Sequence, residues 1–174
     1  MIDIDGTGND KDNMGGIAFA YFVPVTGLDE LPPLRDGSYY TPILLNAGYS
    51  WLSIKHKFEE AKYNNESKET VHGTLFPFVA DFFIPYAHFS KTENFREMVK
   101  HRFLLVTADY NRNSKLSGAP DNTLNYGLHF KFKENVLSKI SGDNGYLITF
   151  YGEFDRPAVG YDYTVITAGG GGGQ

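Results

Sequence analysis

The sequence contains no cysteine, which excludes a disulfide framework, thiolate metal ligands and cysteine-based catalysis. Basic residues are outnumbered, with 16 lysines and arginines against 21 aspartates and glutamates, a formal net charge of −5. An acidic chain is poorly suited to wrapping a nucleic-acid phosphate backbone. The longest hydrophobic run, 17–25, is far shorter than the ~20 residues that span a bilayer. Because residues 1–12 lack the basic and apolar regions of a signal peptide, we expect synthesis in a cytoplasm, no signal-directed export and no membrane partner.

Aromatic residues, by contrast, are abundant: the 174 residues include 14 Phe, 12 Tyr and 1 Trp. Aromatic side chains favour the half-buried faces of β-sheets, and 19 Gly and 8 Pro supply turns between strands. The length is that of one domain. We predict a flexible acidic lead at 1–14, a single β-rich domain at 15–167 and a disordered glycine-rich tail at 168–174.

The alternation of large apolar side chains with other residues predicts the strands. In 17–25 the odd positions are large and apolar, and Ala18 and Ala20 face the other way. The same reasoning predicts strands at 17–25, 50–58, 70–79, 103–107, 126–133, 145–157 and 159–165, with extended loops at 26–42 and 109–123.

One helix is expected, at about 92–102. The segment from Ser90 to Glu93 matches a capping box, and Phe95, Met98 and Val99 then follow helical spacing. The predicted fold is therefore mainly β: a β-sandwich or partly closed β-barrel of seven to nine strands with one short flanking helix.

The strands at 50–58 and 70–79 are expected to form a hairpin centred on Asn64. In that register residue 58 faces 70, 56 faces 72, 54 faces 74 and 52 faces 76. The segment 59–69 then projects as a charged tip that adds little to the core of a monomer. Its mixed charges suit contacts with a neighbouring copy, and the residues expected to make them are Glu59, Glu60, Lys62, Tyr63, Glu66, Lys68 and Glu69.

One string near the start of the sequence is similar to a catalytic motif. Asp3 and Asp5 lie in a D-x-D-G-T string that resembles the nucleophile motif of haloacid-dehalogenase-type phosphatases. Those enzymes place the motif after a buried parallel strand, but only Met1 and Ile2 precede it here, and the alternating α/β pattern is missing. No nucleophile elbow or phosphate-binding glycine loop occurs. We expect no catalytic residue and no enzyme.

The aspartate-rich stretch 3–12 lacks the spacing and terminal Glu of an EF-hand calcium loop, which leaves the histidines as candidate metal ligands. The hairpin register places His56 opposite His72, an arrangement that could begin a zinc site. Because the sequence brings no third ligand near them, the favoured interpretation is two half-buried histidines beside Phe58, without a metal or any other cofactor.

The order of these elements resembles that of the tail tube proteins of tailed bacteriophages. A glycine-led strand at 15–25 comes first, followed by a hairpin with a charged arm, one short helix and paired strands that close on 145–158. The similarity is most evident in Gly16-Ile17, in 21–25 and in the ending 156–158, and it extends over about 15–165.

The resemblance implies a virion structural protein that forms stacked rings, commonly hexameric, around a channel. Its partners would be further copies of itself and other phage tail or neck proteins, with double-stranded DNA as a transient, non-specific passenger. The subunit would be assembled in the cytoplasm of a bacterial host and would reside in the phage tail. The arm 59–69 would contact a neighbouring subunit or ring. A net negative charge suits a lumen through which DNA slides.

Two alternatives stay open at this point. The segment 26–49 is longer and richer in proline than a minimal tube protein needs, and indicates either an outer decoration or a tail terminator or neck protein of similar fold. A ligand-binding β-sandwich module is the alternative of another class. Such a module would be expected to carry aromatic residues at its loop tips, where this sequence instead places Asn, Asp, Glu and Gly.

Overall fold

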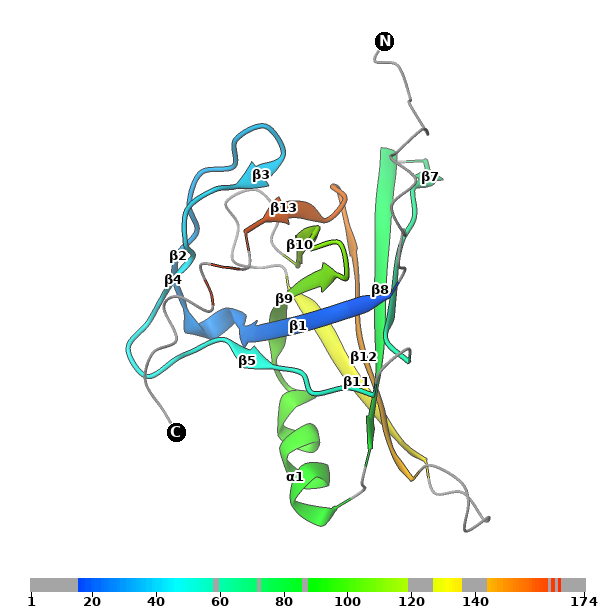
Figure 1. Cartoon of the computed structure of the whole chain (residues 1–174). Helices are drawn as coiled ribbons and strands as arrows, with labels where there is room; N and C mark the ends of the chain where they lie inside the picture. The colour runs from blue at the N-terminus through cyan, green and yellow to red at the C-terminus, as the bar shows by residue number, and fades with distance from the viewer. Residues whose placement is uncertain are drawn as a thin grey trace.

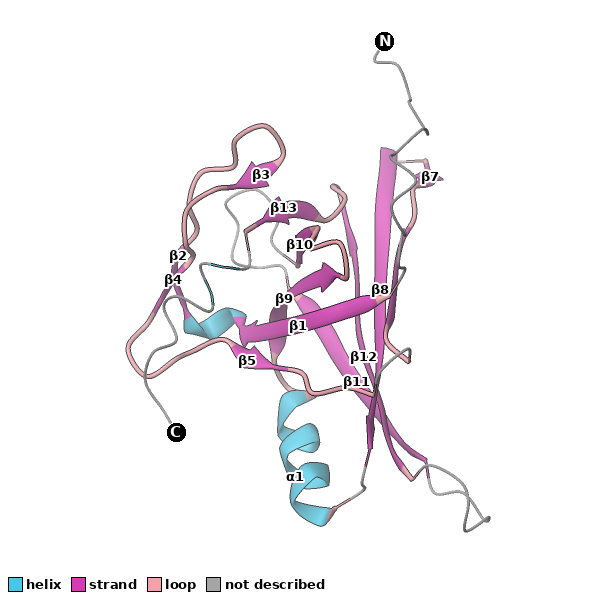
Figure 2. Ribbon diagram, in the orientation of Figure 1, coloured by secondary structure: helices cyan, strands magenta, loops and turns pink. Residues whose placement is uncertain are grey.

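The computed structural model describes residues 16–57, 60–71, 73–85, 88–118, 127–135, 144–162, 164 and 166. These residues are mainly strand, with one α-helix at one side (Figure 2). The sheets do not close into a barrel and resemble a β-sandwich, which confirms the predicted fold class. The predicted lead 1–14 and tail 168–174 lie outside the described residues.

The described strands form two halves that meet at one corner (Figure 1). In the first half β6, β8, β12 and β11 lie side by side, with the short β7 also on β8. In the second half β5, β1, β9, β10, β13 and β3 lie side by side. The corner is made by β9, which pairs with both β10 and the first residues of β11. The bounds of the strands are β1 Ile17–Pro24, β2 Leu28–Glu30, β3 Ser38–Tyr39, β4 Leu44–Leu45, β5 Leu52–Ser53, β6 Lys62–Asn65, β7 Lys68–Thr70, β8 Gly73–Pro85, β9 Arg102–Asp109, β10 Ser114–Ser117, β11 Leu128–Asn135, β12 Gly145–Phe154 and β13 Val159–Tyr161.

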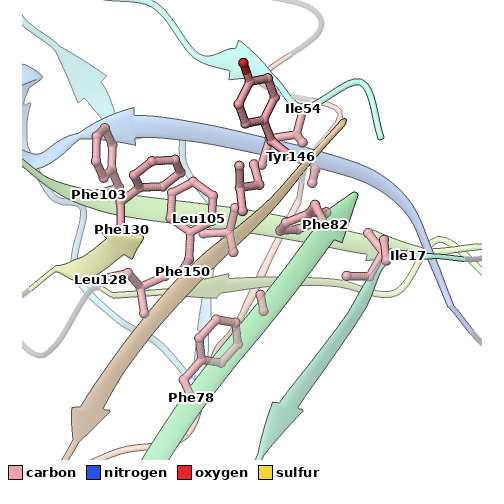
Figure 3. Packing of buried hydrophobic residues seen from close by; sticks show 14 of the residues in the cluster. Ile17, Ile54, Phe78, Phe82, Phe103, Leu105, Leu128, Phe130, Tyr146 and Phe150 are labelled. Carbon is pink, nitrogen blue, oxygen red and sulfur yellow. The ribbon is translucent and has the colours of Figure 1, made fainter. Parts of the chain in front are cut away.

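Aromatic rings fill the space between the two halves (Figure 3). Phe103 of β9, Phe130 of β11 and Phe150 of β12 contact one another, with ring centroids 5.2 Å apart for Phe130 and Phe150. Each comes from a different strand, and the strand register places all three side chains on the faces that meet in this interior. The high Phe content of the sequence is therefore explained by this core.

A second cluster lies on the other side of the second half. It joins Leu104, Val106 and Leu116 to Tyr39 and Ile43 of the proline-rich segment. Leu28 of the same segment is buried there as well, and β2 pairs with β4 within it. The segment predicted as an extended loop at 26–42 thus contains short strands and covers an apolar layer of the core.

A bulge in β1 corrects the predicted faces of the first strand. Its register against β9 shifts between Ile17 and Phe19. The extra residue flips the following side chains, so that Ile17 and Ala20 lie in the cluster between the halves, whereas Val23 lies in the second cluster. Phe19 is 49% exposed, so the prediction that all the odd positions share one face was wrong.

The predicted hairpin about Asn64 was also wrong. Leu52 pairs with Phe22 of β1 instead of residue 76, and the strand expected at 50–58 is reduced to β5. β7 folds back on β8 immediately after Thr70, which lies opposite Gly73. Asn64, the expected turn, is a strand residue opposite Val79. Both Asn64 and Asn65 were interpreted as turn formers, although a sheet edge accommodates them equally well.

The helix α1 spans Phe89–Met98, three residues earlier than the predicted 92–102. Its N-cap is His88, whose ring nitrogen Nδ1 accepts a hydrogen bond from the backbone N–H of Ser90. The capping box was therefore misassigned, because Ser90 lies inside the first turn. Arg102, expected near the end of the helix, begins β9.

The later strands agree with the sequence in position but not in length: β12 ends at Phe154 instead of 157, and β13 ends at Tyr161, so the strand predicted over 159–165 was too long, with Thr164 helical. The buried strand expected at 103–107 is β9, and the alternating strand expected at 126–133 is β11, with Leu128 and Phe130 inside. The loop expected at 109–123 includes one strand, β10. No helix among the described residues has the length and apolar character needed to cross a membrane.

Candidate functional site

The first half of the sheet presents one face to the core, and most described side chains of its opposite surface are exposed or half-buried, with Phe83 and Thr149 buried. We call this second surface the outer face. Its side chains alternate with the buried ones of the same four strands and come together in rows set by the strand register. The residues of the outer face are Lys62, Asn64, Pro77, Val79, Asp81, Phe83, His129, Lys131, Lys133, Leu147, Thr149, Tyr151 and Glu153.

The central row of the outer face is polar. Lys62, Asp81, Thr149 and Lys131 stand opposite one another on the four successive strands. Thr149 Oγ1 donates a 2.7 Å hydrogen bond to Asp81 Oδ1. A carboxylate placed between two lysine positions lessens their repulsion.

The next row is aromatic. His129 stacks on Tyr151 at a centroid distance of 5.3 Å, and Lys131 Nζ lies 5.1 Å from the centre of the same tyrosine ring. Burial, and to a smaller extent the nearby positive charge of Arg102, lower the pKa of His129. The imidazole is therefore neutral at pH 7, and the outer face holds an excess of one positive charge, three lysines against Asp81 and Glu153.

A cavity of about 510 Å³ lies at the end of the outer face nearest the corner. Arg102, His129, Tyr151 and Glu153 provide its polar groups. The Arg102 guanidinium makes one long hydrogen bond, 3.5 Å from Nη1 to the carbonyl of Gly127. The cavity could take a ligand with one anionic group and a flat apolar surface, since arginine binds carboxylates and tyrosine stacks on rings.

The two sides of this half end in strand edges. Among the described residues, β6 pairs with β8 alone, and no strand pairs with β11 on the side opposite β12 beyond His129. Each edge presents backbone N–H and C=O groups that can pair with another strand.

The residues predicted to form a projecting arm lie instead along β8. Lys62 and Tyr63 belong to β6, and Tyr63 stacks on Phe78 at 6.0 Å. Ala61 beside them is buried. The idea that 59–69 stands apart from the fold is therefore wrong, because backbone pairing attaches β6 and β7 to β8.

The remaining predicted assembly residues are exposed but spread out. Glu60 forms an ion pair with Lys57, 2.9 Å from Oε1 to Nζ. Glu66 accepts a hydrogen bond from the side-chain amide of Asn64. Lys68 and Glu69 lie on β7 and are exposed, and Glu59 lies outside the described residues.

The predicted pairing of His56 with His72 finds no support in the register. His56 packs on Phe82 at a ring distance of 5.5 Å, and His72 lies outside the described residues. Within the described ranges no group of three or more His, Asp or Glu side chains could hold a metal ion. Asp3 and Asp5 also lie outside those ranges.

Sequence reasoning missed Arg102, His129, Tyr151 and Glu153 as a group. The alternation of apolar and polar residues in β11 and β12 places His129 and Tyr151 on the faces that point away from the core. The sequence could therefore have predicted that these two side chains share a surface. Arg102 was assigned to a helix, and nothing in the sequence indicates that β9 turns the corner beside them.

Comparison of the chain with protein-family models, with curated proteins and with solved structures finds no match.

Proposed function

We propose that this chain is a structural subunit that assembles with copies of itself into stacked rings, as the tail tube proteins of tailed bacteriophages do. The observation that carries the proposal is the pair of open edges, β6 and β11, on opposite sides of one four-stranded half. The role is structural and involves no catalytic step. The proposed location is the phage tail, after assembly in the cytoplasm of the bacterial host.

Edge pairing supplies the contact between neighbouring subunits. If β6 of one copy pairs with β11 of the next, both edges are satisfied and the sheet continues from copy to copy. Such a contact joins two different surfaces, so it is heterologous and closes into a ring when the rotation between copies permits. We propose a hexameric ring by analogy with tail tubes.

The outer face of each copy would then belong to one continuous surface of the ring. It combines three lysines with two carboxylates and with aromatic rings, whereas the chain as a whole has a net charge of −5. A subunit of this charge suits double-stranded DNA as a passenger that slides past without being held. A tail terminator or neck protein, which forms a single ring, is the closest alternative role within the same assembly.

Engineered disulfides test the edge contact directly, because the natural chain has no cysteine. One cysteine replaces Asn64 on β6 and a second replaces Lys133 on β11. Within one copy these positions are separated by β8 and β12, which places them more than roughly 14 Å apart, whereas a disulfide needs Cα atoms within about 7 Å. Oxidation should therefore give covalent multimers on a non-reducing gel, with rings in negative-stain micrographs.

As a control, each single cysteine variant should give at most a dimer. The register between copies is tested by moving one cysteine by two residues along the same face, with Lys62→Cys in place of Asn64→Cys or Lys131→Cys in place of Lys133→Cys. A protein that stays monomeric at every concentration, and forms no multimers with any of these pairs, would contradict the proposal.

The cavity beside Arg102 favours a second candidate, a ligand-binding module. A thermal-shift screen with saccharides and short acidic peptides tests this candidate. Any compound that raises the melting temperature is then measured again with the Arg102→Ala variant. Saturable binding by a monomeric protein, lost in Arg102→Ala, would favour the module over the ring-forming subunit.

A further inference from the structure

An apolar groove lies between α1 and the ends of β5 and β8. We call it the α1 groove. It has a volume of about 440 Å³, and the apolar side chains that line it are Phe22, Ile54, Ile84, Phe95, Met98 and Ile148. No residue of α1 is fully buried, and Phe95 and Met98 are only half-buried against the core. The helix therefore leaves the groove open along one side.

Two lysines also line the α1 groove. Lys55 is exposed, and Lys91 Nζ donates a 3.0 Å hydrogen bond to the carbonyl of Pro85. The groove thus offers apolar surface inside and positive charge beside it. A matching occupant presents an apolar side chain next to an acidic one.

The turn between β7 and β8 presents such a pair. Val71 is 100% exposed, more than any other large apolar residue described, and Glu69 stands two residues before it on an exposed stretch of β7. Beside Val71, Thr70 Oγ1 donates a 2.6 Å hydrogen bond to the carbonyl of Gly73, which links the end of β7 to the start of β8.

The groove and the turn lie at opposite ends of one long strand. β8 has 13 residues, which corresponds to roughly 40 Å, and the turn precedes its first residue whereas Ile84 and Pro85 at its other end line the groove. Figure 1 accordingly shows β7 and α1 toward opposite ends of β8. A contact between them must therefore join two molecules, and repeating it stacks copies end to end.

We propose that Val71 of one copy inserts into the α1 groove of the next copy, with Glu69 facing Lys55. This inference rests on the proposed function, since both need self-association. It adds the contact that joins one ring to another, whereas edge pairing joins subunits within a ring. A subunit with both contacts builds a tube, and a subunit that loses the Val71 contact builds rings alone.

A second disulfide pair tests the insertion. Cysteines at positions 71 and 91 lie roughly 40 Å apart within one molecule, so a bond between them links two copies. We expect Val71→Cys with Lys91→Cys to give covalent chains on oxidation. Val71→Asp should raise the concentration for half-maximal stacking about tenfold or more, because a buried valine is replaced by a charge. Tyr40→Asp, at another exposed apolar position, is the matched control and should leave stacking unchanged.

Charge exchange provides an independent readout. Glu69→Lys and Lys55→Glu should each weaken stacking, and the two changes together should restore it. A general loss of stability would not produce that restoration.

The outcomes separate the two proposals. Rings without stacks in Val71→Asp support the insertion. Normal stacks in Val71→Asp, with no link between positions 71 and 91, overturn the insertion and leave the edge-pairing proposal intact. If the variant with Asn64→Cys and Lys133→Cys forms no multimers, edge pairing is overturned. The disulfide between positions 71 and 91 then tests the insertion independently of edge pairing. If a cysteine at position 91 bonds instead to one at position 4, the groove holds the N-terminal residues and the insertion is overturned.

Discussion

Thr149 and Asp81 face each other across β12 and β8, and the threonine hydroxyl donates a 2.7 Å hydrogen bond to the carboxylate. Thr149 is 5% exposed although it belongs to the outer face. The bond supplies a half-buried carboxylate with a partner in the middle of an otherwise exposed row.

Thr149→Val should lower the free energy of unfolding by about 1–2 kcal/mol, because it keeps the shape of the side chain but removes the donor to a charged group. Urea denaturation measures the change. Thr74→Val is the matched control, since Thr74 is an exposed residue on β8, and it should shift stability by less than about 0.5 kcal/mol. Equal effects of the two substitutions would mean that the bond contributes nothing.

Tyr146 attaches the helix to the sheet. Its hydroxyl donates to the carbonyl of His88 at 3.0 Å, accepts from the His88 N–H at 3.2 Å and lies 2.7 Å from the Thr92 hydroxyl. We expect Tyr146→Phe to cost about 1–2 kcal/mol of stability and to speed hydrogen exchange of the α1 amides more than that of β9. Tyr40→Phe, at an exposed tyrosine, serves as the control. Unchanged exchange in α1 would show that the helix is held by Phe95 and Met98 alone.

Two glycines with nearly the same backbone angle differ in their surroundings. Gly118 has φ +89° and a Cβ there would lie 2.7 Å from the carbonyl oxygen of Phe103, whereas Gly48 has φ +88° and nothing within 4 Å. Gly48→Ala should cost only the left-handed backbone penalty, about 1–2 kcal/mol. Gly118→Ala should cost clearly more, because the backbone must also move away from Phe103. Thermal unfolding of the two variants gives the comparison, and equal losses would argue against a close approach at Gly118.

The lowered pKa of His129 predicts a pH dependence. Burial, and then Arg102, hold this pKa below its ordinary value of 6.5, so below that pH the unfolded chain binds more protons than the folded one. The stability associated with His129 is thus complete above about pH 6.5 and is lost as the pH falls through the folded-state pKa. His129→Phe keeps a ring against Tyr151 and should show a smaller fall in the urea midpoint between about pH 7.5 and about pH 5. An NMR titration that placed the pKa of His129 above 6.5 would contradict the expectation.

Which parts of the fold the sequence could predict depends on whether the partner strand is local. β11 and β12 were found because their alternation specifies a buried face, as for Phe130 between His129 and Lys131. β9 was found because its continuous apolar run indicates a buried strand. The hairpin about Asn64 failed because β5 pairs with β1, more than 25 positions earlier, and no local signal announces such a partner. The bulge after Ile17 is of the same kind, since only the register against β9 reveals it.

The candidate site was less accessible to sequence reasoning than the fold. Charge and exposure correctly indicated that Glu60, Lys68 and Glu69 lie on the surface. They could not indicate that Lys62 and Tyr63 pair with β8, because a charged strand at a sheet edge and a charged loop have similar compositions. The two open edges and the α1 groove depend on strand order, which a single sequence does not specify.

The pairing of β1 with β9 has a consequence for synthesis of the chain. Ile17 pairs with Asp109, so a strand made near the start must wait for the translation of 109 − 17 = 92 further residues. At 5–20 residues per second the delay is roughly 5–20 s. During that time the two-residue strand β5 is the first described partner available to β1, and an apolar strand with one edge unpaired is prone to aggregate. The yield of folded protein should therefore rise when translation between β1 and β9 is fast. It should also rise when chaperones that bind exposed apolar segments are abundant.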